Sequence, residues 1–170
     1  MRSLVKRMLL IALGLAGACA PTTAQSTGSA EEAIRQVVSA LAGNDQAALT
    51  KLSIDQPEFK KYLWPAFAMN LSTSNMSADK YYPTYQKANQ AGIAETSTIL
   101  AGKKWQVVKV DLQPAPRRGK GFQIYGPPLV TLRDEGGQEK TVKLVGGLLE
   151  RDGVHKVTTF YVSPSLRASK

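Results

Sequence analysis

The chain has 170 residues and a net charge of +9, and 43% of its residues are hydrophobic. This length suits one domain with a leader or a tail, and the apolar content excludes a disordered protein. One cysteine and one histidine exclude a disulfide framework and are too few for a typical zinc site, so we expect no metal and no cofactor. The excess of basic residues favours anionic partners.

The first 18 residues have the pattern of a secretory leader. Residues 1–7 carry three cations and no acid, and residues 8–16 are apolar and uncharged. Such a run is far shorter than the ~20 residues that span a bilayer, so it is typical of a signal peptide rather than a transmembrane helix. We therefore expect residues 1–18 to be removed, which would lower the net charge from +9 by its three cations to +6.

The only cysteine follows this leader directly. The stretch LAGA before Cys19 resembles a bacterial lipobox, which predicts a lipidated Cys19 as the mature N-terminus. A lipid anchor of several chains holds firmly because each buried CH₂ contributes ~0.8 kcal/mol. Ala20 follows the cysteine, and by resemblance to Gram-negative sorting this implies the outer membrane, with the domain facing the periplasm. The alternative is cleavage after Ala24, which would release a soluble periplasmic protein; nucleic acid is not an expected partner in either case.

The pattern from residue 19 to residue 102 predicts a tether and then helices. Residues 19–28 are small and polar, which indicates a flexible tether, and the domain is expected over residues 29–163 with a disordered tail at 164–170. Capping boxes open helices at Ser29 and Asp55. We expect helices over 30–42, 46–52, 57–64 (interrupted by Pro65) and 83–101, with a loop over 69–79.

The second half of the chain changes to alternating apolar and polar residues. Strands are predicted over 105–112, 122–133, 141–150 and 154–162, with turns over 113–121, 134–138 and 151–153. Pro127 and Pro128 must interrupt the second strand, and Gly146 with Gly147 predicts a bend or bulge in the third. Helices followed by hairpin-linked strands predict an α+β fold, with the N-terminal helices packed on one face of a curved four-stranded antiparallel sheet.

This order of elements resembles the nuclear transport factor 2-like (cystatin-like α+β) superfamily. The resemblance covers most of residues 30–162 and rests on three stretches, which are 41–67, 125–135 and 145–161. Within the superfamily the chain is similar to small proteobacterial lipoproteins without an established activity. The resemblance implies a cone-like sheet that wraps a long helix around a pocket.

Some members of this superfamily are enzymes, which use Asp with Tyr, or His with Asp, inside the cone. His155 lies just past a turn, where we expect an exposed or partly covered side chain. Asp111 with Tyr125 would provide a base and a hydroxyl donor if both faced the cone. The alternative places Lys109 and Asp111 in solvent, and it is favoured because three of the four residues that would then point inward are apolar: Gln106, Val108, Val110 and Leu112.

Aromatic and basic residues are the remaining candidates for a site. Five aromatic side chains are predicted to line a pocket for an apolar or flat ligand, unless they only fill the core: Trp64, Tyr85, Trp105, Tyr125 and Phe160. Three cations in one loop are predicted to contact anionic headgroups, unless the loop is a solvated hairpin tip: Arg117, Arg118 and Lys120.

Together these patterns favour a non-catalytic, membrane-anchored lipoprotein of the periplasm that binds a small molecule or an envelope partner. An alternative is a lyase or isomerase that uses polar residues inside the cone. A third is a structural subunit that pairs through the outer face of its sheet.

Overall fold

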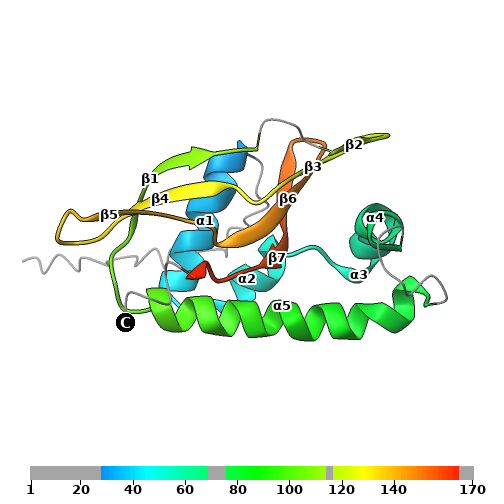
Figure 1. Ribbon diagram of the computed structural model, residues 1–170, viewed down its shortest axis with the longest axis horizontal. Helices are drawn as coiled ribbons and strands as arrows, with labels where there is room; N and C mark the ends of the chain where they lie inside the picture. The colour runs from blue at the N-terminus through cyan, green and yellow to red at the C-terminus, as the bar shows by residue number, and fades with distance from the viewer. Residues whose placement is uncertain (1–27, 69–75, 114–116, 165–170) are drawn as a thin grey trace, which may run out of the picture.

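The computed structural model describes residues 28–68, 76–113 and 117–164. The predicted leader, Cys19, almost all of the predicted tether and residues 165–170 lie outside this part of the chain. The described residues form an α+β fold in which helices precede two antiparallel sheets, as Figure 1 shows. No helix among them has both the length and the apolar character needed to cross a membrane.

The first two helices confirm the sequence predictions. The predicted apolar stripe of α1 is buried from Ala30 to Leu41. Ser29 Oγ accepts the Glu32 N–H at the start of α1, and Asp45 Oδ1 accepts the Ala48 N–H at the start of α2. The helices of the described chain are α1 Ala30–Ala42, α2 Gln46–Leu52, α3 Gln56–Glu58, the π-helix η1 Phe59–Leu63, α4 Trp64–Ala68 and α5 Ala78–Leu100.

The predicted interruption at Pro65 is wrong, because the helical segment continues to Ala68. Asp55 and Glu58 form the predicted capping box at its start. The Trp64 N–H donates to the Phe59 carbonyl five residues back, which closes the π-helix η1. Pro65 then falls in the first turn of α4, where a helix tolerates a residue without an N–H.

The long helix α5 begins at Ala78, so the predicted start at Pro83 and the predicted loop over 78–79 are wrong. Ser77 caps the helix by accepting the Lys80 N–H. Pro83 lies inside the helix, at its sixth residue, where it cannot donate the backbone hydrogen bond to the Asp79 carbonyl. With 23 residues, α5 is about 35 Å long.

The strands form two sheets, so the prediction of a single four-stranded sheet is wrong in its strand count and connections. The three-stranded sheet has the order β1-β4-β5, and the four-stranded sheet has the order β2-β3-β6-β7. The strands are β1 Gln106–Asp111, β2 Arg117–Gly119, β3 Phe122–Tyr125, β4 Leu129–Arg133, β5 Glu139–Val142, β6 Val145–Arg151 and β7 Val154–Phe160.

Two predicted strands each divide between the sheets. The chain leaves the four-stranded sheet after Tyr125 and enters the three-stranded sheet at Leu129, across Pro127 and Pro128. Proline cannot donate to a sheet ladder, which explains the break. A second crossing separates β5 from β6 at residues 143–144, and a short strand, β2, lies within the predicted turn over 113–121.

The predicted turns and the predicted bulge are confirmed where they join neighbouring strands. Asp152 and Gly153 have φ values of 52° and 76° in the β6–β7 turn, as a type I′ hairpin requires. The β6–β7 register shifts on both sides of Gly147, which is the predicted bulge. The Asp134 N–H donates to the Gln138 carbonyl across the β4–β5 turn.

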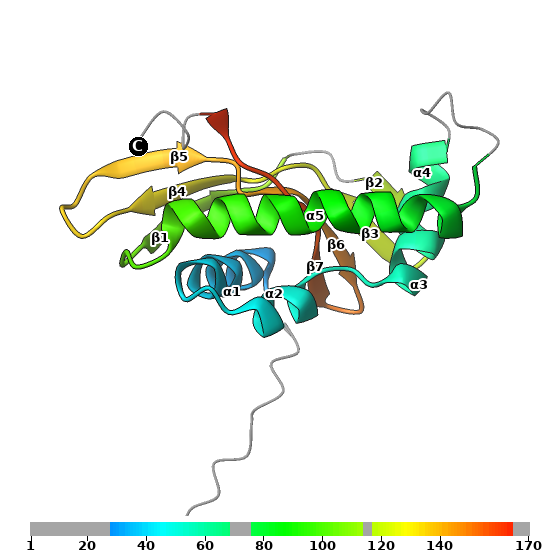
Figure 2. The ribbon, with the colours of Figure 1, turned by 90° about the horizontal axis from the view of Figure 1, so that it is seen from below.

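Two apolar clusters stabilise the fold. The larger one joins α1 and the C-terminal half of α5 to both sheets, so α1 covers the four-stranded and the three-stranded sheet together. The smaller one surrounds Phe59, whose side chain is completely buried, and it joins the segment over 56–68 to the N-terminal half of α5. Figure 2 shows α5 running along most of the molecule, from α3 and α4 past α1.

Three residues on one face of α5 attach this helix to β7. The Asn89 side chain accepts the Phe160 N–H at 2.8 Å, and the Tyr85 hydroxyl donates to the Thr158 carbonyl. One turn beyond Asn89, Gly92 lies so close to β7 that an added Cβ would be 2.5 Å from the Phe160 carbonyl oxygen. The glycine therefore allows the helix backbone to approach the strand.

We predict that Gly92→Ala destabilises the protein by about 1–3 kcal/mol, because the new methyl group overpacks the contact with β7. Helix propensity alone predicts the opposite sign, a gain of about 1 kcal/mol. Urea unfolding of both proteins measures the difference. Ala91→Gly, at an exposed neighbouring position, gives the size of the propensity effect, and a stabilised Gly92→Ala protein would contradict the close contact.

Candidate functional site

The structure divides the five predicted ligand-binding aromatics between the two apolar clusters. Trp64 and Tyr85 belong to the cluster around Phe59, whereas Trp105, Tyr125 and Phe160 belong to the larger cluster. The five side chains therefore do not converge on one pocket. Each of the two groups packs against the core of its own half of the molecule.

Tyr85 and Phe160 take part in the attachment of α5 to β7. Both are buried, at 5% exposure. The Tyr85 hydroxyl donates to the Thr158 carbonyl, and burial raises the pKa of this phenol. The Phe160 N–H is bound by Asn89. These contacts give both residues a structural role.

Asp111 and Tyr125 lie in different sheets, so the arrangement that an isomerase would need does not form. Asp111 pairs with Lys109 at 2.8 Å on the exposed face of β1, as the alternative interpretation predicted. The predicted inward face of β1 is nevertheless wrong at several positions, because the register of β1 shifts between Val107 and Lys109. Val107 is buried, whereas exposure is high at Gln106, Val108 and Leu112.

His155 is buried, with 8% of its surface exposed, and the prediction of an exposed or partly covered side chain is wrong. It lies two residues before Val157 in β7, and both side chains are on the buried face of this strand. The Tyr125 ring lies 6.3 Å away, centre to centre. Nδ1 of His155 has no hydrogen-bond partner among the described residues.

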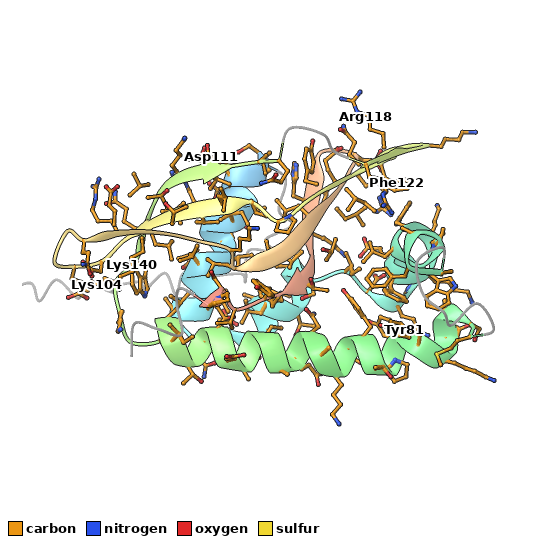
Figure 3. All side chains as sticks on the ribbon, in the orientation of Figure 1. Tyr81, Lys104, Asp111, Arg118, Phe122 and Lys140 are labelled. Atoms are coloured by element: carbon orange, nitrogen blue, oxygen red, sulfur yellow. The ribbon has the colours of Figure 1, made fainter. Side chains whose placement is uncertain are left out.

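A groove between the helical segment 56–68 and the β2–β3 hairpin is the best candidate for a functional site. Its volume is about 550 Å³, within the range of sites for small organic molecules. In Figure 3, Phe122 lies between this hairpin and α4. The described residues that line the groove are basic or apolar, and none is acidic: Lys61, Tyr62, Pro65, Ala66, Arg117, Arg118 and Phe122.

The floor of this groove is an aromatic pair from the two sides. The Tyr62 and Phe122 rings are 4.8 Å apart at an angle of 55°, a favourable geometry for aromatic side chains. Phe122 pairs with Gly119 across the hairpin, and its ring occupies the space that a Cβ at Gly119 would fill. Glycine at this position therefore lets the Phe122 ring lie against its own hairpin.

Cations surround the Tyr62 ring. Lys61 Nζ is 5.1 Å from the ring centre, and Arg151 Cζ is 6.0 Å from it. Arg151 also donates to the Tyr62 hydroxyl at 3.4 Å. This hydrogen bond, together with the Lys61 ammonium group, lowers the pKa of Tyr62, because positive charge favours the phenolate.

The predicted basic loop contributes two of its three cations to the groove. Arg117 lies opposite Ile124 in the hairpin, two residues before Gly119, and so shares the strand face of Phe122. Arg118 alternates to the other face, and Figure 3 shows it extending away from α4 at the rim. Within the described chain, neither arginine has an ion pair. Lys120 lies in the turn, outside the lining.

Two other hollows among the described residues are also lined by cations. The hollow between α1 and β1 contains Arg35, Lys103 and Lys104 and no acid. Its arginine donates to the Val107 carbonyl at 2.7 Å and pairs with Glu31 at 2.6 Å. The hollow at the end of α5 holds Lys103 and Lys140 beside two acidic residues, Asp134 and Glu135. The groove differs because two arginines without an ion pair in the described chain line it beside a pair of aromatic rings.

Sequence reasoning missed Lys61, Tyr62, Pro65 and Phe122 as site residues. The two sides of the groove are more than fifty positions apart in the chain, and no local pattern indicates that they meet. The adjacent lysines at 60 and 61 on a predicted helix were the only available signal, and they indicate a solvated face as well as a site.

Comparison of the chain with protein-family models, with curated proteins and with solved structures found no match. The described residues also contain no group of three or more His, Cys, Asp or Glu side chains placed to hold a metal ion.

We predict that the pKa of Tyr62 is lower than the pKa values of Tyr82 and Tyr85. Positive charge lowers the pKa of Tyr62, whereas burial raises the pKa of the other two. Arg151→Leu removes the main cause, so the Tyr62 pKa should rise towards its ordinary value. Carbon-13 NMR of the tyrosine rings as a function of pH measures this. An unchanged Tyr62 titration in the variant would contradict the Arg151 contact, and Tyr82 serves as the internal control.

Proposed function

We propose that this protein is a lipid-anchored, non-catalytic binding module of the periplasm, and that the groove between segment 56–68 and the β2–β3 hairpin is its ligand site. Cys19 carries the anchor, and the outer membrane is the membrane to which it holds the domain. The ligand is an anionic molecule. The observation that carries the binding role is the groove itself, in which Lys61, Arg117 and Arg118 surround an aromatic floor.

The charge of the groove supports this role. The lining cations have no acidic neighbours within the described lining, so an anionic ligand would provide the missing counter-charge. Arginine presents a planar fork that suits carboxylate, sulfonate and phosphate groups. The apolar floor adds affinity for an apolar part of the ligand and selects ligands by shape, and it does not attract cations.

We also propose that the domain belongs to the nuclear transport factor 2-like superfamily. The two antiparallel sheets are taken as parts of one curved, cone-like sheet of the nuclear transport factor 2-like kind. The order of the elements supports this, because all described helices but the last turn at residue 164 precede the strands, and α1 packs against both sheets. The lipobox-like stretch before Cys19 supports the anchor.

We predict that Cys19→Ser moves the protein from the detergent phase to the aqueous phase when membrane fractions are partitioned with Triton X-114, because the acyl chains provide the apolar contact. Mass spectrometry of the wild-type protein should find a mature N-terminus at Cys19 with added acyl mass. An N-terminus at Gln25 without acyl mass would instead support the soluble periplasmic alternative.

We predict that the protein binds anilinonaphthalene sulfonate, an anion with an aromatic body, at one saturable site. Arg117→Glu should weaken this binding by about tenfold, because a lining cation becomes an acid. Fluorescence titration measures the affinity. Lys87→Glu on α5 makes the same change in net charge at an exposed position elsewhere, and equal weakening by both variants would contradict a specific groove.

A further inference from the structure

The lining of the groove combines basic side chains with aromatic surface. The basic side chains of Lys61 and Arg117 come from its two opposite sides, one from η1 and one from β2. Between them lie the Tyr62 and Phe122 rings, which are in contact with each other. A complementary ligand therefore has an anionic group and an apolar body in one molecule.

The size of the groove excludes a small inorganic anion as the best fit. Its volume of about 550 Å³ is in the range that holds an organic molecule. A lone phosphate would contact only exposed cations, and exposed ion pairs in water contribute little. An apolar body attached to the same anion would also cover the aromatic floor, and burial of apolar surface is favourable.

The cations of the groove suit a phosphate group. Arginine binds phosphate oxygens in a bidentate manner, and lysine adds a point charge. Arg117 has no partner among the described ion pairs and side-chain hydrogen bonds, whereas Arg151 already holds Tyr62 and Asp152. Arg117 is therefore the residue placed to bind the anionic group, and Arg151 positions the floor.

On this basis, which rests on the proposed function, we infer that the groove binds a single phosphate-bearing amphiphile, with its phosphate at Arg117 and Lys61 and its apolar body on the Tyr62 and Phe122 rings. The same chemistry is offered by the headgroup region of a phospholipid and by a free organic phosphate ester. Inorganic phosphate shares the anion but lacks the apolar body.

The test uses the full chain carrying Cys19→Ser, which avoids detergent, and calorimetric titration with monomeric dihexanoyl phosphatidylglycerol. We expect saturable binding of one molecule per protein. Arg117→Glu should weaken it by at least about tenfold, and Lys120→Glu by less than about twofold, because Lys120 lies in the same hairpin but outside the lining. Circular dichroism establishes that each variant is folded.

Three further probes distinguish the sources of the phosphate. Dihexanoyl glycerol phosphate and phenyl phosphate present a lipid-like and a simple organic ester, and stronger binding of one of them identifies the source. Inorganic phosphate should bind at least about tenfold more weakly than either ester. Equal affinity for inorganic phosphate would contradict an amphiphilic ligand. Absence of saturable binding to phosphatidylglycerol and to both other esters would contradict it as well.

The outcome separates this inference from the proposed function. If anilinonaphthalene sulfonate binds in a manner that depends on Arg117 but none of the phosphate esters does, the groove is an anion site and the ligand class is wrong. Equal weakening by Arg117→Glu and Lys120→Glu would show that the hairpin attracts anions only through its general charge, which overturns the site itself.

Discussion

The attachment of α5 to β7 is the contact on which the rest of the structure depends. Asn89 and Tyr85 bind backbone groups of β7, and Gly92 lets the two backbones approach. Leu149 of β6 also packs in the smaller cluster, so this cluster, with Phe59 at its centre, is joined to the sheet that carries the β2–β3 hairpin both directly and through α5. The groove exists because these two parts are held at a fixed separation.

The groove uses side chains that the fold does not need for its core. Tyr62 contributes to the core and to the groove, because it packs in the smaller cluster and also forms the groove floor beside Phe122. Arg117 contributes no ion pair among the described residues, so its charge is available to a ligand. Lys61 and Arg151 are arranged around the Tyr62 ring, so positive charge lies beside this aromatic surface.

Local sequence signals predicted local structure well. The Ser29 and Asp55 caps, the stripe of α1, and the Asp152–Gly153 turn are all set by near neighbours, and all are confirmed. Division of the strands into two sheets was not predictable, because Pro127 and Pro128 indicate a break without indicating which strand the chain pairs with next. The register shift between Val107 and Lys109 likewise places Val107 inward and Val108 outward, against the expected faces of β1. Only Arg117 and Arg118 of the groove were among the predicted site residues, since the remaining residues meet through tertiary contacts.

The most direct test of a ligand between the Tyr62 and Phe122 rings is an NMR measurement of contacts between the protein and dihexanoyl phosphatidylglycerol. The account predicts intermolecular Overhauser effects from the acyl protons of this lipid to both rings, while its glycerol phosphate protons lie near Arg117. Overhauser effects to Trp105, in a different part of the molecule, with none to Tyr62 or Phe122, would contradict it.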